Sequence, residues 1–253
     1  MTEESVEFLH AIDRSDLIAG VSVYAKRPEG VKKHPVISSF THANLKKIKG
    51  LHPDLVIGFS DIQKDIAKEL IAEGIDVYIS NQRSLKEIFR YMWTLGHMVG
   101  EGEKTNHYLS LLEEKMEEAR EFALGIKVRP RVYLEEWDEP QICGIRWFSE
   151  LVTLCGGDDI FSSKSQSGVK ANERFVTNLE VGEKNPDIIL ASWCGKKVDL
   201  SSITNRSELI NCEAVLNNRV YELPPEVFLQ PGPALFVDGI DQLMELFRPF
   251  YSK

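Results

Sequence analysis

The sequence lacks a long apolar segment, an excess of positive charge and a cysteine pattern typical of a metal site. No apolar run reaches the ~18–20 residues that a membrane-spanning helix needs, so we expect no membrane insertion. Lys and Arg number 30 against 39 Asp and Glu, and the net charge of −9 argues against nucleic acid as a partner. The four cysteines form no C-x-x-C pair, and we expect free thiols, with Cys155 and Cys212 as small buried side chains.

Motifs of the common enzyme classes are missing as well. There is no G-x-G-x-x-G after a strand, no P-loop and no G-x-S-x-G. The six histidines all fall in the first half and lack metal-ligand spacing. The pair Glu135-Glu136 is weak evidence for acid/base chemistry in so acidic a chain. We therefore predict no catalytic residues, no metal site and no required cofactor.

The N-terminal residues are polar and acidic and do not resemble a signal peptide. The sequence as written predicts a cytoplasmic protein, and free cysteines agree with a reducing compartment. If an export segment was removed, a periplasmic or extracytoplasmic location is expected instead.

The pattern of apolar residues predicts an α/β protein with two Rossmann-like lobes. Each lobe has a parallel sheet, and one long helix joins the two lobes. In the first half, Leu55–Phe59 is an apolar run typical of a buried strand, a helix follows Asp61, and Ile75–Ile79 is the next strand. The highly charged helical pattern from Glu103 to Leu124 is long enough, on the order of 30 Å, to join two domains. We predict an N-terminal lobe at 1–102, a linking helix at 103–126 and a C-terminal lobe at 127–253.

The second half shows a similar alternation. The patterns predict strands at 131–136, 185–191 and 219–223, helices at 147–155 and 172–182, a Ser-rich loop at 162–167 and a final helix after Pro231-Gly232-Pro233. The hexamers His52-Pro53-Asp54-Leu55-Val56-Ile57 and Asn185-Pro186-Asp187-Ile188-Ile189-Leu190 share one pattern, as two similarly built lobes would.

Aromatic and polar residues follow the predicted strands. In open parallel sheets, ligands bind outside the carboxyl ends of the strands. Tryptophan supplies a large flat contact area, which suits a flat ligand of cofactor size. The predicted ligand-binding residues are Tyr24, Lys26, Arg27, Ser60, Trp137, Trp147, Trp193, Cys194 and Gly195. A core or loop-bracing role remains open for each tryptophan.

Several stretches resemble the substrate-binding proteins of cobalamin and iron-siderophore ABC importers over nearly the whole chain. The stretches are Leu51 to Ile57, Glu135 to Trp137, Gly144 to Leu151, Cys155 to Phe161, Asn185 to Leu190, Trp193 to Gly195 and Pro231 to Pro233. The resemblance implies a cleft between two lobes that binds cobalamin or an iron chelate, with Trp147, Trp193, Cys194 and Gly195 lining it. It also implies an ABC permease as partner, which members contact through exposed glutamates, and Glu180 matches such a position.

The chain departs from this family at three places. The first strand that members carry before the first helix is absent, since the chain starts at the helix itself. The "C-D-Y-P" of cobalamin-binding members is replaced by Ala25-Lys26-Arg27-Pro28, and this basic loop suits an anionic ligand better. The first lobe offers no clear docking glutamate.

Two other functions stay open. One is a cytoplasmic binding or sensor module that has lost transport, which the missing first strand favours. The other is a two-domain α/β transferase, for which Lys26, Arg27 and Arg83 are the only hints of a phosphate site.

Overall fold

The computed structural model describes residues 1–251 and divides the chain into two compact α/β units. Unit 1 comprises residues 1–82, 86–111 and 231–233. Unit 2 comprises residues 83–85, 112–230 and the described residues from 234 onward. The long helix α5, Gly102–Leu124, contributes residues to both units.

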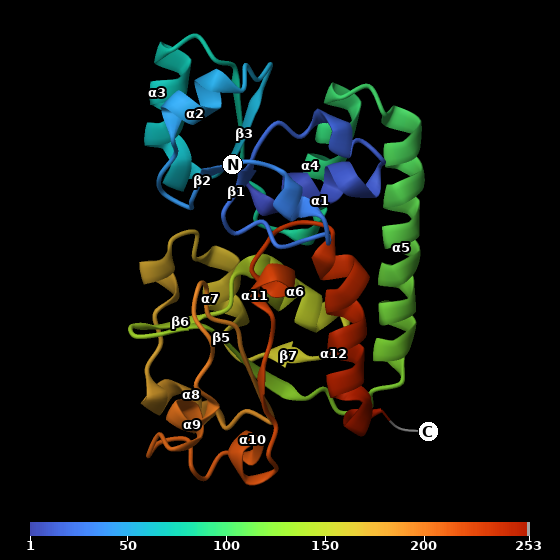
Figure 1. The fold of residues 1–253 in the computed structure, drawn as a ribbon. Helices are drawn as coiled ribbons and strands as arrows, with labels where there is room; N and C mark the ends of the chain where they lie inside the picture. The colour runs from blue at the N-terminus through green and yellow to red at the C-terminus, as the bar shows by residue number, and fades with distance from the viewer. Residues whose placement is uncertain (252–253) are drawn as a thin grey trace. The chain divides into compact units, whose positions relative to one another are not determined.

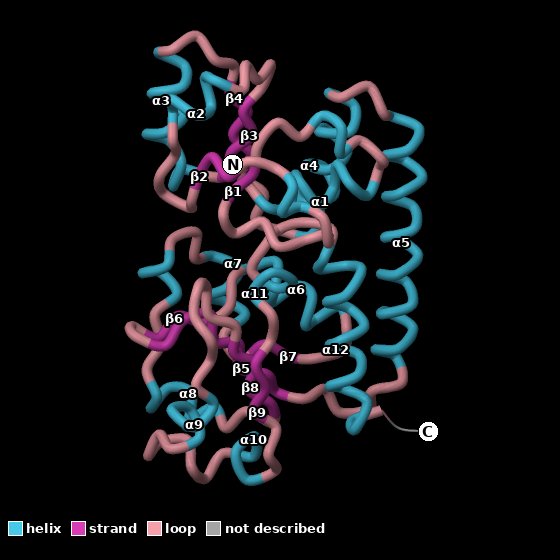
Figure 2. Tube along the Cα trace, viewed as in Figure 1, coloured by secondary structure: helices cyan, strands magenta, loops and turns pink. Residues whose placement is uncertain are grey.

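Unit 1 carries two separate two-stranded parallel sheets, β1–β2 and β3–β4 (Figure 2). Its elements are α1 (Glu3–Ala11), β1 (Val21–Ser22), β2 (Val36–Ser38), α2 (Leu45–Gly50), β3 (Val56–Phe59), α3 (Lys64–Ala72), β4 (Val77–Ser80), α4 (Leu85–Met98, from Lys86 onward) and the first part of α5, with short 3-10 turns at Ser15–Leu17, Val31–Lys33 and Asp61–Gln63. The predicted βαβ unit is confirmed: β3 and β4 pair in parallel register from Val56↔Val77 to Phe59↔Ser80.

Helices cover both faces of these strands. One apolar cluster joins Ile37 of β2 and Val56 of β3 to Ile48 of α2 and Leu70 of α3. A second cluster joins Val21 of β1 to Val6 of α1. Because successive side chains of a strand point to opposite faces, α2 and α3 cover one face while α1 covers the other (Figure 1).

Unit 2 is built on a five-stranded mixed sheet with the order β6-β5-β8-β9, and β7 pairs with β5. Only β6 is antiparallel. The elements that follow α5 are β5 (Arg131–Asp138), β6 (Gln141–Cys143), α6 (Arg146–Leu154), β7 (Asp158–Asp159), α7 (Ser162–Ser167), a 3-10 turn at Ala171–Arg174, α8 (Asn178–Lys184), β8 (Ile188–Ala191), α9 (Leu200–Thr204), α10 (Glu213–Leu216), β9 (Val220–Glu222), α11 (Pro225–Phe228), a π-helical turn at Leu235–Gly239, α12 (Ile240–Phe247) and a 3-10 turn at Arg248–Phe250.

Strand β8 and the middle of β5 are buried in unit 2. Every residue of β8 is buried, as is β5 from Val132 to Glu135. On one face, Tyr133 and Ile189 pack with Val181 of α8 and Ile203 of α9. On the other face, α6 and α11 meet through the rings of Phe148 and Phe228, whose centroids lie 5.1 Å apart. The parallel α/β class predicted from the sequence is confirmed.

Two predicted segments are wrong. Residues 162–167 form helix α7 and not a Ser-rich loop, because Ser165 is buried and its hydroxyl donates to Asp159 at 2.8 Å. The helix predicted at 172–182 is divided: a 3-10 turn ends at Arg174, and α8 begins after Thr177, whose side chain caps it. The two helical segments are separated at Phe175, whose backbone is extended, and Arg174 at the end of the 3-10 turn forms an ion pair with Glu136.

The cysteine prediction holds: all four are free, Cys155 and Cys212 are buried, and Cys194 is exposed.

Within residues 1–251 no helix combines the length and apolar character needed to cross a bilayer.

Candidate functional site

The carboxyl ends of β5 and β8 place Trp137 and Trp193 near one another in unit 2. Strands β5 and β8 are parallel neighbours, so the segments that follow them leave the sheet at the same edge. Trp193 is buried and belongs to the core cluster beneath α8 and α9, and Trp137 packs half-buried against that cluster.

Lys196 connects the two indoles. Its ammonium lies 4.3 Å from the centre of the Trp137 ring and 4.7 Å from the centre of the Trp193 ring. It also pairs with both carboxylate oxygens of Asp138, at 2.6 and 2.8 Å. A cation over an indole face is attracted by the ring quadrupole, so Lys196 holds the exposed loop after β8 against the end of β5.

The buried ion pair between Glu135 and Arg206 orients the indole of Trp193. Its Nε1 donates to Glu135 Oε1 at 3.3 Å, and Arg206 binds the same carboxylate through both terminal nitrogens, with Nη2–Oε1 at 3.0 Å. Burial lowers the pKa of Arg206, but the hydrogen bond and charge of Glu135 outweigh it and leave that pKa raised. Glu135 is thus fully buried and fully paired.

Glu136 is held in the same way on the opposite face of β5. Arg174, itself buried, binds its carboxylate with Nη2–Oε1 at 3.1 Å. Each glutamate of the Glu135-Glu136 pair therefore has its own arginine, and the two carboxylates face opposite sides of the sheet. This arrangement gives them structural partners and no shared substrate position.

The remaining predicted residues of unit 2 are divided between core and surface. Trp147 is buried at the start of α6, and its Nε1 donates to the carbonyl of Phe228 at 3.0 Å. Cys194 and Gly195 are exposed, and Gly195 has a φ of +79°, which a side chain would strain. Glu180 binds Lys164 at 3.1 Å and closes the capping box of α8, and the Lys164 hydrogen bond lowers its pKa.

In unit 1, the predicted residues at the ends of β1 and β3 also differ in exposure. Tyr24 is exposed, and Arg27 forms an ion pair with Glu7 at 3.0 Å. Ser60 is completely buried and its hydroxyl accepts from the amide of Ile62, so it caps the turn at the end of β3. Lys26 lies on the same loop as Tyr24 and Arg27.

Sequence reasoning did not identify Lys196, Asp138 and Arg206. The run Trp193-Cys194-Gly195-Lys196-Lys197 carries the signal for Lys196, because a lysine three residues after a tryptophan across a glycine turn can fold back on the ring. Arg206 carries no such local signal, since its partner Glu135 is 71 residues away. Among residues 1–251 no cluster of three or more His, Cys, Asp or Glu side chains is placed to hold a metal ion.

Comparison with known proteins decides the family. The model of the family described as "Periplasmic binding protein" matches residues 1–227. The chain belongs to this family.

Named relatives and solved structures agree with this assignment. The uncharacterized ABC transporter substrate-binding lipoprotein YvrC of Bacillus subtilis (strain 168) is 22% identical over 97% of this chain and 77% of its own. A vitamin B12-binding protein of Yersinia pestis (strain Pestoides F) is 23% identical over 79% of this chain and 70% of its own.

Two solved structures share the fold. The periplasmic vitamin B12-binding protein BtuF of Vibrio cholerae matches 99% of this chain and 95% of its own at 23% identity, with a TM-score of 0.77. A periplasmic heme-binding protein of Pseudomonas aeruginosa covers 99% of this chain and 91% of its own at 15% identity, with a TM-score of 0.83. The resemblance read from the sequence is confirmed at the level of family and fold.

Proposed function

We propose that this periplasmic binding protein family member binds a corrinoid or a related tetrapyrrole or iron chelate and delivers it to an ABC permease. Its relatives include vitamin B12-binding and heme-binding proteins. Binding, and not catalysis, is the proposed activity, because the paired carboxylates at the strand ends are neutralised by arginines.

The observation that carries the proposal is the Trp137–Lys196–Trp193 arrangement. Trp137 is half-buried at the end of β5, and Lys196, exposed, occupies its face. A flat ligand can replace the ammonium on this face by stacking, while the ammonium turns to an acidic substituent of the same ligand. Ligands with carboxylate side groups therefore suit the site better than neutral ones.

The other predicted contacts have separate roles in the proposal. Tyr24 and Lys26 would contribute a ring and a positive charge, which again favours an acidic ligand, and Arg27 would add a contact although Glu7 balances its charge. Cys194 and Gly195 are exposed beside Lys196 and remain proposed ligand contacts. Trp147, Trp193 and Ser60 are buried in the structure, and we propose that they support the loops instead.

The test is a titration of the full chain with haem, cyanocobalamin, cobinamide and a ferric siderophore, followed by tryptophan fluorescence and visible absorbance. We expect saturable quenching by at least one ligand. Trp137→Ala is expected to weaken binding about tenfold or more, because it removes the stacking face.

Trp93→Ala is the matched control, since Trp93 is also an exposed indole but lies on α4 of unit 1, stacked on His97. We expect it to leave the affinity unchanged. Lys196→Gln should weaken haem more than cobinamide. If no ligand of the panel binds, or if both tryptophan variants behave alike, the proposal is wrong.

A further inference from the structure

Two histidines that are distant in the sequence pack against each other in unit 1. His10 lies in the last turn of α1, and His34 directly follows the 3-10 turn Val31–Lys33. Their ring centroids are 6.2 Å apart, the ring planes cross at 74°, and both side chains are half-buried. Local sequence spacing gives no signal for this pair, because only the fold brings the two segments together.

The ε-nitrogens of both rings lack hydrogen-bond partners. Each Nε2 is buried, and among residues 1–251 no atom forms a hydrogen bond with either one. A buried polar atom in a folded protein normally has a partner, so each exception calls for a physical explanation. Two such nitrogens on neighbouring rings have a common explanation if both are ligands of one ion.

A hydrogen bond of the His34 ring determines which of its nitrogens carries the proton. The ring donates to the carbonyl of Ile18, and because Nε2 has no partner, Nδ1 is the donor. Nε2 of the neutral ring is then unprotonated and offers a lone pair. Metal-binding histidines are commonly held in this way, with one ring N–H donating to a backbone carbonyl and the other nitrogen on the metal.

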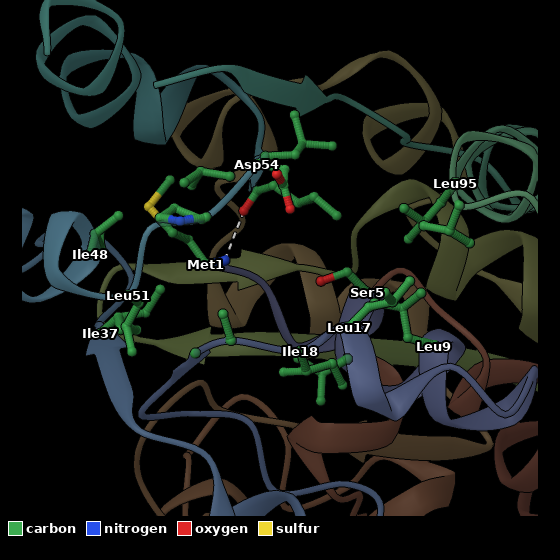
Figure 3. Close-up of a pocket in the computed structure, with 18 of the residues that line it drawn as sticks. Met1, Ser5, Leu9, Leu17, Ile18, Ile37, Ile48, Leu51, Asp54 and Leu95 are labelled. Atoms are coloured by element: carbon green, nitrogen blue, oxygen red, sulfur yellow. Dashed lines mark hydrogen bonds between the residues drawn. The ribbon is translucent and has the colours of Figure 1, made fainter. Parts of the chain in front are cut away.

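The histidine pair is separate from the cavity of unit 1 that Figure 3 shows. Leu9, which precedes His10, and Ile18, the partner of His34, both line that cavity, but neither histidine does. The pair is also separate from the proposed ligand site, since neither ring is among the proposed ligand contacts. It therefore needs an explanation of its own.

The charge state of both rings suits a metal ligand. Burial lowers the pKa of His10, and the charges of Lys33 and His34 lower it further. Burial and Lys33 also lower the pKa of His34, against the effect of its bond to Ile18. Both imidazoles are therefore neutral near pH 7, which is the form that binds metals. Lys33 is exposed, so solvent and salt screen its repulsion of a bound cation.

The distance between the rings indicates the coordination geometry. A metal ion bound to both Nε2 atoms at about 2.0 Å places the centroids about 6 Å apart if the nitrogens and the metal are in line, and about 5 Å apart at a tetrahedral angle. The observed 6.2 Å agrees with the linear arrangement. Within residues 1–251 no group of three or more His, Cys, Asp or Glu side chains is placed to hold a metal, so no third side chain of these types joins the pair.

From these observations we propose that His10 and His34 bind one copper(I) ion between their ε-nitrogens. Copper(I) has a filled d shell and accepts two nitrogen ligands in a line, and imidazole is a suitable ligand for copper. Zn²⁺ instead takes four ligands in a tetrahedron, which two histidines at this spacing do not provide.

A water molecule is the simplest competitor for this position. It would donate one hydrogen bond to each ε-nitrogen. Two hydrogen bonds are fewer than the three or so that a buried water usually makes. Copper(I), in contrast, is fully coordinated by the two rings.

The experiment titrates copper(I) into the full chain without oxygen, in competition with the coloured chelator bicinchoninate. Cys194 is replaced by serine in every protein used, because an exposed thiol also binds copper(I). We expect the protein to take one equivalent of copper from the chelator. X-ray absorption of the complex should show copper with two nitrogen neighbours and no sulfur.

Substitution of each ligand tests the assignment. His10→Ala and His34→Ala should each weaken copper(I) binding by about 100-fold or more, since the loss of a mere outer partner of a metal ligand already costs roughly 10–100-fold. The double variant should bind no more weakly than either single one, because a linear site needs both rings. His107→Ala, at an exposed histidine of α5, is the matched control and should leave the affinity unchanged.

Urea unfolding shows whether each variant is folded and gives a second measure of binding. Copper(I) should raise the midpoint of the Cys194→Ser protein and of His107→Ala, but not that of the variants at positions 10 and 34. The proposal is overturned if the chelator keeps all the copper, or if His34→Ala and His107→Ala bind it equally. Zn²⁺ binding as tight as that of copper(I), or a crystal structure of the copper-treated protein with only water between the rings, overturns it as well.

Discussion

Glu4 shows how a single buried carboxyl influences unit 1. It lies in the first turn of α1, almost fully buried, and Gln82 Nε2 donates to its Oε1 at 3.4 Å. Gly232 leaves no space beside it, because a Cβ there would lie 2.4 Å from the Glu4 Cβ. Burial, followed by the neighbouring charge of Glu3, raises the pKa of Glu4 to about 8.

This pKa predicts a loss of stability as pH rises. The unfolded glutamate releases its proton near pH 4.5, but the folded one retains it until about pH 8. The folded state therefore binds more protons in this range, and its free energy of unfolding falls from pH 4.5 to 8. Glu4→Gln should be more stable than the natural chain at pH 8.5 and closely similar at pH 4.

Urea unfolding at several pH values measures this effect. The amino group of Met1, whose pKa burial lowers to about 6, acts in the opposite direction between pH 6 and 8. Because the charge of Glu4 raises the pKa of this amino group, Glu4→Gln lowers that pKa further, and the difference between the two proteins includes this coupled contribution. Glu69→Gln, on the exposed side of α3, is the control and should follow the natural chain. A pH-independent difference for Glu4→Gln would contradict the prediction.

Hydrogen bonds and ion pairs between residues far apart in the sequence cannot be predicted from local patterns, and this limits how much of the candidate site the sequence predicts. Trp137 and Trp193 were predicted from their positions after strands, because strand ends are visible as apolar runs. The burial of Trp147 and Ser60 was not, since it depends on Phe228 and on the turn after β3. Whether any of these residues contacts a ligand stays a prediction.

Elements with strong periodicity were predicted well, and short ones were missed. Strands β3, β4, β5, β8 and β9 and helices α5 and α6 appear close to their expected residues. Strands β1 and β7 have two residues each, and α10 and α11 have four. Such segments are too short for a periodic signal and are fixed by tertiary packing.

The packing of α4 on α5 within unit 1 depends on one glycine. A Cβ at Gly96 would lie 1.8 Å from Thr105 Oγ1 and 2.7 Å from Thr105 Cβ, and Thr105 is fully buried. Gly96→Ala gains about 1 kcal/mol of helix propensity but must separate the helices, and overpacking of this kind costs about 1–3 kcal/mol. We expect a net loss of stability in urea unfolding.

Gly50 offers a matched control for this change. It is the last residue of α2, and a Cβ there would meet no atom within 4 Å. Gly50→Ala should therefore be neutral or slightly stabilising. Combining Gly96→Ala with Thr105→Ala removes Oγ1 and should recover part of the loss, and equal stability of the single and double variants would refute the steric explanation.

At the scale of the molecule, the two units differ in how completely their sheets are assembled. Strands β5 and β8 of unit 2 lie inside a five-stranded sheet and are covered on both faces. Unit 1 divides its strands into two pairs, β4 is half-buried along its whole length, and a cavity adjoins β3. Isolated two-stranded sheets are marginally stable, so unit 1 should open more readily.

Native-state hydrogen exchange tests this difference without any ligand. We expect the amides of Leu134 and Leu190 to exchange only by opening of the whole of unit 2, and those of Val56 and Gly58 to exchange faster, by about tenfold or more. Low concentrations of urea should accelerate Val56 and Gly58 first, because opening unit 1 exposes less surface than global unfolding. Equal exchange rates and equal urea dependence in both units would mean that the chain opens as one cooperative unit, and the divided sheet would then not be a weak point.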